Sequence, residues 1–216
     1  KSRILHVPKI LYHWRATKGS TALEVKQKRN VFDVTEKAIK ECFKRRNIKA
    51  GISFHEQRWN YPRIKYVAFE EASPTVSILI PTRDRIDLLQ KCITSIFSTI
   101  GYSKFEVIVI DNESKEGSSH DYLEKIKKEK RVTVLSIPAE FNYSKLNNLA
   151  TEKAQGEILL LLNNDIEAIS KGWFEEMLSH AMRSEIGCVG AKLLYPDDRI
   201  QHGGVIVGLG GGAGHS

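Results

Sequence analysis

The stretch EILLLLNNDIE, residues 157–167, carries the clearest structural signal in the chain. Its five consecutive hydrophobic residues, 158–162, show no polar alternation and predict a strand buried on both faces, as in the centre of a sheet covered by helices. Asn163, Asn164 and Asp165 then stand at the carboxyl end of that strand. Ligands bind at this end of open α/β sheets, where an acidic residue can hold a divalent cation. Taken alone, the triplet is equally compatible with a plain turn, because Asn and Asp are favoured turn residues.

The composition limits the class of protein. A chain of 216 residues can bury a full core. Its apolar runs are all shorter than the ~20 residues that cross a bilayer, and its first residues lack the pattern of a signal peptide. The cysteines, Cys42, Cys92 and Cys188, are widely spaced without a CxxC pair, which favours reduced structural thiols over a zinc site. These features predict a cytoplasmic protein.

The net charge of +7 is unevenly distributed. Residues 1–75 hold 17 basic and 7 acidic side chains, whereas residues 76–216 hold 16 basic and 19 acidic ones. The basic first third could contact the inner face of the cell membrane peripherally, or it could be an ordinary solvated helix face. No RRM, KH or helix-turn-helix signature accompanies it, which argues against a nucleic-acid partner.

Residues 1–74 predict a helical and extended appendage. Asp33 and Glu36 fit a capping box, and the apolar residues that follow recur at helical spacing until Gly51. The aromatic residues and the proline within 52–72 predict extended segments.

From residue 75 onward, strand and helix patterns alternate. Strands are expected at 76–80, 105–110, 132–137, 158–162 and 187–195, with a helix in each of the four intervals. Asp84 or Asp87 fits a helix N-cap, and Gly156 fits a helix C-cap. The alternation predicts an α/β fold with a mostly parallel sheet flanked by helices. The sequence contains no GxGxxG motif after the first strand and no GxxxxGK[ST] motif, which argues against dinucleotide oxidoreductases and P-loop NTPases.

Three polar segments follow strands of this predicted sheet. They are PTRDR at 81–85, DNES at 111–114 and NND at 163–165. Because the carboxyl ends of parallel strands share one edge, the three segments are expected to converge on a single site.

These residues also carry a family resemblance. The segments VSILIPTRDRIDLLQKCITSI, FEVIVIDNES, FNYSKLNN, GEILLLLNNDIE and IGCVGAKLLYPDDRIQHGGV occur in that order. Together they resemble the family 2 glycosyltransferases of the GT-A fold, especially bacterial enzymes that build surface polysaccharides such as O-antigen. The resemblance runs from Pro74 to Ser216, which implies a GT-A nucleotide-sugar-binding domain over 75–216.

The resemblance implies roles for individual residues. Pro81, Thr82 and Arg83 would border the base and ribose of a nucleotide, and Asp111 would accept a hydrogen bond from the imide N–H of uracil or thymine. Further residues near the nucleotide-sugar would be Asn142, Asn148, Asn164 and Asp165. Asp165 would be the metal ligand for Mg²⁺ or Mn²⁺. The sequence departs from the family pattern in one respect, since NND holds one carboxylate where the family often has two.

The implied activity is transfer of a sugar from a nucleotide-diphospho-sugar donor, of UDP or dTDP type, to a glycan or lipid-linked glycan acceptor, with inversion. The family's general base lies in a region that would follow Ser216, so the chain is expected mainly to bind the donor. Residues 1–74 resemble the end of a preceding glycosyltransferase unit joined to a linker helix. A non-catalytic nucleotide-sugar-binding module remains the alternative.

Overall fold

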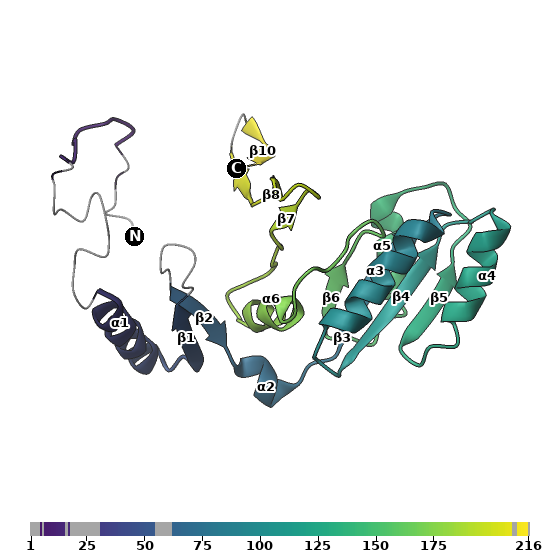
Figure 1. Cartoon of the computed structure of the whole chain (residues 1–216), viewed down its shortest axis with the longest axis horizontal. Coiled ribbons are helices and arrows are strands. Elements are labelled where there is room, and N and C mark those ends of the chain that lie inside the picture. The colour runs from purple at the N-terminus through teal and green to yellow at the C-terminus, as the bar shows by residue number, and fades with distance from the viewer. Residues whose placement is uncertain are drawn as a thin grey trace. The chain divides into compact units, whose positions relative to one another are not determined.

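The computed structural model describes residues 5, 7–15, 17, 31–54, 62–208 and 211–215, and Figure 1 traces the chain. The chain divides into two units, Lys1–Ile64 and Lys65–Ser216. The functional domain boundary predicted between residues 74 and 75 stays a prediction.

The first unit contains the predicted amphipathic helix, α1 (Val31–Arg46). Asp33 lies inside the first turn of α1, so the prediction that Asp33 caps the helix is wrong. The helix also ends before Gly51, because the chain enters a strand at Ala50. Strands β1 (Ala50–Phe54) and β2 (Pro62–Tyr66) form a two-stranded sheet, in keeping with the expected extended segments.

Four parallel strands form the main sheet of the second unit. They are β3 (Val76–Thr82), β4 (Phe105–Asp111), β5 (Val132–Ser136) and β6 (Ile158–Leu161). Their order across the sheet is β5-β4-β3-β6. The predicted α/β class with a parallel sheet is therefore confirmed.

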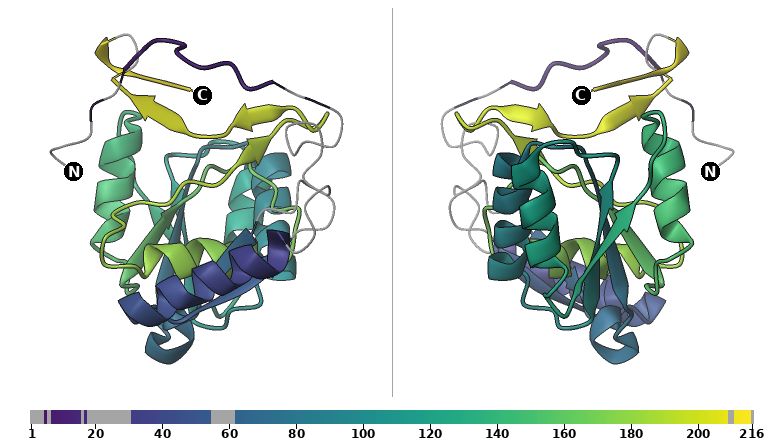
Figure 2. Two further views of the ribbon diagram at one scale, coloured as in Figure 1. Left: turned by 90° about the vertical axis from the view of Figure 1, so that its left-hand side faces the viewer. Right: turned by 90° about the vertical axis from the view of Figure 1, so that its right-hand side faces the viewer.

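Helices cover both faces of this sheet, as Figure 2 shows for α3 and α4 on one side and α5 on the other. The helices of the second unit are α2 (Ala68–Ala72), α3 (Ile86–Thr99), α4 (Gly117–Ile126), α5 (Tyr143–Thr151) and α6 (Trp173–Ala181). Side chains of α3, α4 and α6 form the larger core with alternate residues of β3 and β4. Leu146 and Ala150 of α5 pack against Leu79, Ile108 and Ile110 on the opposite face.

Strand β6 differs from the prediction of a central strand buried on both faces. Within the described residues β6 pairs only with β3 and lies at the edge of the sheet. Ile158 and Leu160 pack on the larger core, whereas Leu159 and Leu161 are 41% and 50% exposed. Five apolar residues in a row indicated a strand, but the number of its neighbours depends on other segments.

Gly156 does not cap a helix as predicted. Helix α5 ends at Thr151 with Glu152 as its C-cap. Gly156 instead packs against the start of β3, where its amide donates to the Ser77 hydroxyl over 2.9 Å. A Cβ at this position would lie 2.5 Å from the backbone nitrogen of Ser77, so only glycine fits without a shift.

The residues after α6 form short strands. These are β7 (Leu193–Leu194), β8 (Ile200–His202), β9 (Val205–Val207) and β10 (Ala213–His215), which pair as two antiparallel hairpins. The strand expected over 187–195 is thus confined to β7. Among the described residues, every helix is too short or too polar to cross a bilayer.

Candidate functional site

The sheet has a topological switch point between β3 and β6. The chain runs outward from β3 through β4 to β5, and then returns past the starting strand to form β6 on the other side of β3. The connection that leaves β3 passes through α3 on one face of the sheet, whereas the connection that returns to β6 passes through α5 on the other face. In open α/β sheets, the crevice at the carboxyl ends of such a strand pair is where ligands bind.

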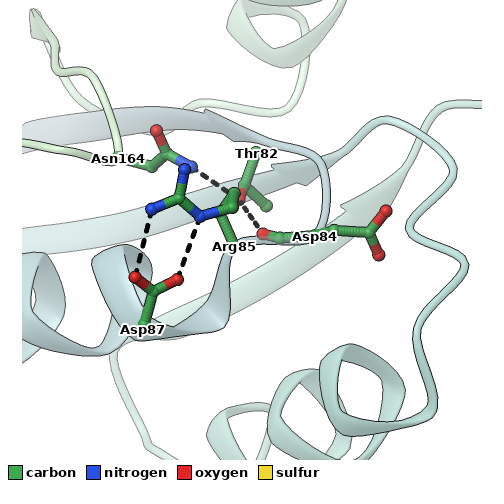
Figure 3. A network of polar contacts seen from close by, with 5 residues as sticks. All are labelled: Thr82, Asp84, Arg85, Asp87 and Asn164. Atoms are coloured by element: carbon green, nitrogen blue, oxygen red, sulfur yellow. Dashed lines mark hydrogen bonds and ion pairs between the residues drawn. The ribbon is translucent and has the colours of Figure 1, made fainter.

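The carboxyl ends of β3, β4 and β6 meet at this edge, as predicted. Thr82, the last residue of β3, is paired in register with Asp111, the last residue of β4. On the β6 side, the Leu162 amide donates to the Leu79 carbonyl over 3.0 Å. The Asn164 side-chain amide then donates to the Thr82 hydroxyl over 3.0 Å, which ties the NND triplet to the end of β3 (Figure 3).

A second set of hydrogen bonds joins the segments after β3 and β4. The Asp84 amide donates to the Ser114 hydroxyl over 2.8 Å, and the Ser114 amide donates to Asp111 Oδ1 over 2.9 Å. Asp111 and Ser114 are both buried, so these contacts hold the Asp111 carboxylate in a fixed orientation.

Asp84 also corrects a prediction about helix capping. The N-cap of α3 is Arg85, which makes no side-chain cap, and Asp87 lies in the first turn. Asp84 Oδ1 instead accepts hydrogen bonds from the amides of Glu116 and Lys115, just before α4. These amide donors hold the pKa of Asp84 below its usual value, because they favour its charged form.

The backbone at this edge adopts a conformation that residues other than glycine rarely adopt. Asp84, Arg85 and Glu113 have φ angles of 53°, 50° and 57°, in the left-handed region. Non-glycine residues in this region are held there by their surroundings, and they cluster at functional sites.

Two arginines project near the end of β3. Arg83 is exposed. Arg85 forms two 3.2 Å contacts with the carboxylate of Asp87 (Figure 3), and this pairing lowers the pKa of Asp87. Both partners of the pair are more than half exposed, so its contribution to stability is small.

The segment after β5 is attached to the same edge through Asn112, which is 1% exposed. Its side-chain amide donates to the carbonyls of Ile137 and Ala139, over 3.1 and 2.7 Å. Asn142 then caps α5, because its Oδ1 accepts from the Lys145 amide over 2.9 Å. Asn148 is exposed on the same helix.

The segment that carries Asp165 is more open. Asn163, Asp165 and Glu167 are exposed, whereas Asn164 is half-buried. The thiol of Cys92 on α3 lies 3.7 Å from the Asn163 carbonyl. Burial raises the pKa of Cys92 to about 12, and the negative charge of Asp165 adds to the rise, so this thiol is protonated at neutral pH.

The donors available to a metal are few. Among the described residues, no three His, Cys, Asp or Glu side chains gather closely enough to hold an ion. Asp165 offers one exposed carboxylate, and Figure 3 shows the Asn164 carbonyl oxygen directed away from Thr82. Mg²⁺ usually keeps several waters and takes one or two carboxylates together with substrate phosphates. The residues present therefore fit a cation that is bound jointly with a phosphorylated ligand.

The positioning roles of several residues at this edge were not predicted from the sequence. Ser114, Asn112, Asp84 and Cys92 hold the candidate residues in place, although none of them was singled out for that role. The first three lie inside or beside the quoted segments PTRDR and DNES, so a search for side chains able to bond backbone amides could have found them. Cys92 carried no such signal.

Comparison with known proteins identifies the family. Residues 77–203 match the family described as Glycosyl transferase family 2. The chain is 41% identical over 215 residues to an uncharacterized protein, y4gI, of Sinorhizobium fredii, covering 99% of this chain and 23% of that protein. It is 35% identical over 217 residues to the O-antigen biosynthesis protein RfbC of Myxococcus xanthus, covering 99% and 16%. The chain thus spans less than a quarter of the length of either relative.

The fold has a counterpart among solved structures. The chain matches a mannosyltransferase from Pyrobaculum calidifontis, solved in complex with GDP-mannose and Mn²⁺, with a TM-score of 0.51 and 20% identity. The match covers 58% of this chain and 37% of the other. This likeness supports the expected GT-A fold, and the family match covers the parallel sheet and its carboxyl edge. The chain therefore belongs to glycosyl transferase family 2.

Proposed function

We propose that the protein transfers a sugar from a nucleotide-diphospho-sugar donor, of UDP or dTDP type, to a glycan or lipid-linked glycan acceptor of the cell surface. The chain described here would mainly bind the donor. The observation that carries the proposal is the hydrogen bond from Asn164 to Thr82, because it closes the switch point between β3 and β6 into one site. The relative named for O-antigen biosynthesis supports the class of acceptor.

The part of the site formed by residues 81–84 and 111–114, here the nucleoside half, would take the base and ribose. Asp111 Oδ1 accepts the Ser114 amide, and a carboxylate retains lone pairs to accept the imide N–H of uracil or thymine. Pro81, Thr82 and Arg83 would border the ribose and base from β3. Asn142, at the start of α5, and Asn148 would lie toward the sugar nucleotide from the opposite side.

The part formed by residues 163–168, here the phosphate half, would take the diphosphate. Asp165 would hold Mg²⁺ or Mn²⁺, which when bound supplies positive charge that neutralises the departing diphosphate. Asn164 would add a neutral oxygen beside it. Because the triplet holds one carboxylate, the cation is expected to bind tightly only together with the nucleotide.

The chemistry proposed is a direct displacement at the anomeric carbon of the donor sugar. An acceptor hydroxyl forms the new bond as the bond to the diphosphate breaks, which inverts the configuration. Fixed dipoles that face the developing charge on the diphosphate lower the barrier for this step. The general base that takes the acceptor proton is not assigned to a residue of this chain.

The basic first third would serve a peripheral contact with the membrane surface that carries a lipid-linked acceptor. Residues 1–75 hold ten more basic than acidic side chains, since 17 exceed 7 by that number. Clusters of Lys and Arg are attracted to anionic leaflets. Sedimentation with vesicles that contain phosphatidylglycerol, compared with neutral vesicles, would test this contact.

A thermal-shift panel with UDP, dTDP and GDP sugars, each with Mn²⁺ and with EDTA, tests donor binding. A ligand at 100 times its Kd should raise the melting temperature by about 5–10 °C for a protein of this size. We expect the largest shift with a UDP or dTDP sugar in Mn²⁺. Absence of any shift across the panel would contradict the proposal.

A non-catalytic module that binds a nucleotide-sugar is the second candidate, and the single carboxylate of the NND triplet favours it. Release of nucleotide diphosphate distinguishes the two. Release that depends on a glycan acceptor supports the transferase, whereas donor binding without release in the full-length protein supports the module.

A further inference from the structure

One stripe of helix α3 holds the segment that carries Asp165. The Ala168 amide donates to the Ser95 hydroxyl over 3.0 Å, and the Trp173 indole N–H donates to the Thr99 hydroxyl over 2.9 Å. Cys92 adds its weaker thiol contact to the Asn163 carbonyl. Residues 92, 95 and 99 recur at helical spacing, so they share one face of α3.

Ser95 is the central member of this stripe. It is 8% exposed, and its hydroxyl donates to the Cys92 carbonyl over 2.8 Å while it accepts the Ala168 amide. The Ser95 hydroxyl therefore acts both as a donor and as an acceptor of hydrogen bonds within the protein. Ala168 lies only three residues after Asp165, so this bond limits the positions that the carboxylate can take.

Helix α3 also begins at the nucleoside half. It starts at Ile86, directly after the Thr82–Arg85 turn whose threonine receives the Asn164 amide. The segment of residues 163–168 is thus tied to β3 at Thr82, and to α3 at Cys92 and Ser95. Leu162, just before it, adds the bond to the Leu79 carbonyl. None of its residues is fully buried: Asn163, Asp165 and Glu167 are exposed, and Ile166 is half-buried. Hydrogen bonds to β3 and α3 therefore contribute to the position of the segment.

We propose that Ser95 is a positioning residue that holds Asp165 ready for joint binding of a divalent cation and the donor diphosphate. This inference rests on the proposed function of the same site. Divalent cations demand a defined ligand geometry, and a loosened segment must be ordered again at each binding event. The effect should therefore fall on binding that needs the cation and spare binding that does not.

The test measures UDP binding by calorimetry on the whole chain, once with Mn²⁺ and once with EDTA. Ser95→Ala leaves the Ala168 amide without its acceptor, and we expect it to weaken binding in Mn²⁺ by roughly 3–10-fold. Binding in EDTA should match that of the parent chain. The control is Ser98→Ala on the same helix, whose hydroxyl bonds the Ser95 carbonyl and not the segment 163–173.

Thr99→Val provides a second variant if Ser95→Ala does not fold. It keeps the shape of the side chain but removes the acceptor of the Trp173 indole, and a smaller loss of the same kind is expected. Equal binding of UDP in Mn²⁺ by the variants and the parent would overturn the inference, as would an equal loss in Mn²⁺ and EDTA. If the parent itself binds no nucleotide, the proposed function fails first, and the inference falls with it.

Discussion

The nucleoside half and the phosphate half of the proposed site are built in different ways. In the nucleoside half, the carboxylate of Asp111 and the hydroxyl of Ser114 are buried and bonded to backbone amides. In the phosphate half, Asp165 is exposed, and the contacts that fix it involve the backbone around it. A group that reads a base benefits from a fixed orientation, whereas a group that shares a cation with water and phosphate must stay open.

Replacing Asp165 should have the largest effect on binding. Asp165→Ala removes the only carboxylate of the NND triplet, and we expect UDP binding in Mn²⁺ to weaken by at least ~100-fold, or roughly 2.7 kcal/mol. The melting temperature should not change, because the side chain is exposed. Glu157→Ala is the control, since Glu157 is an exposed carboxylate just before β6 and outside both halves of the site. Equal affinity of the Asp165 variant and the parent would show that the metal assignment is wrong.

Replacing Asp111 should affect binding with and without the cation alike. Asp111→Asn keeps the shape of the side chain but removes its charge, and a loss of about tenfold is expected for both UDP in Mn²⁺ and UMP in EDTA. Calorimetry with the two ligands checks this. A loss confined to the Mn²⁺ titration would place Asp111 in the phosphate half and remove the distinction between the halves.

Adding a carboxylate to the phosphate half should strengthen binding of the cation alone. Asn163→Asp places a second acidic residue in an exposed position of the triplet, and we expect Mn²⁺ affinity without nucleotide to rise by roughly 3–10-fold. Electron paramagnetic resonance of free Mn²⁺ measures the change. Unchanged affinity would mean that residue 163 does not face the cation.

A change at the amino-terminal end of β3, far from the carboxyl ends that form the site, should leave binding of UDP unchanged. Gly156→Ala brings a Cβ to within 2.5 Å of the Ser77 nitrogen, and we expect a loss of stability of about 1–3 kcal/mol. Chemical denaturation measures that loss, and calorimetry should give the parent's affinity for UDP. A parallel fall in affinity would indicate that the site responds to strain anywhere in the sheet.

The sequence predicted the features that depend on local patterns. Alternating strands and helices indicated the parallel sheet, and that sheet brought Thr82, Asp111 and Asn164 to one edge as expected. Features that depend on distant partners were missed. Asp84 was expected to cap the helix after it, but its carboxylate bonds amides about 30 residues away, and Ser95 contacts a segment more than 70 residues away.

Nuclear magnetic resonance with Mn²⁺ tests most directly the claim that three strand ends form one donor site. In the presence of UDP, a bound Mn²⁺ ion should broaden the amide signals of residues 82–85, 111–115 and 163–166 together. Gly156, which packs against the amino-terminal end of β3, should keep its amide signal. Broadening that spares any of these three segments, or that centres on the exposed acidic turn at Asp197 and Asp198, would contradict the account.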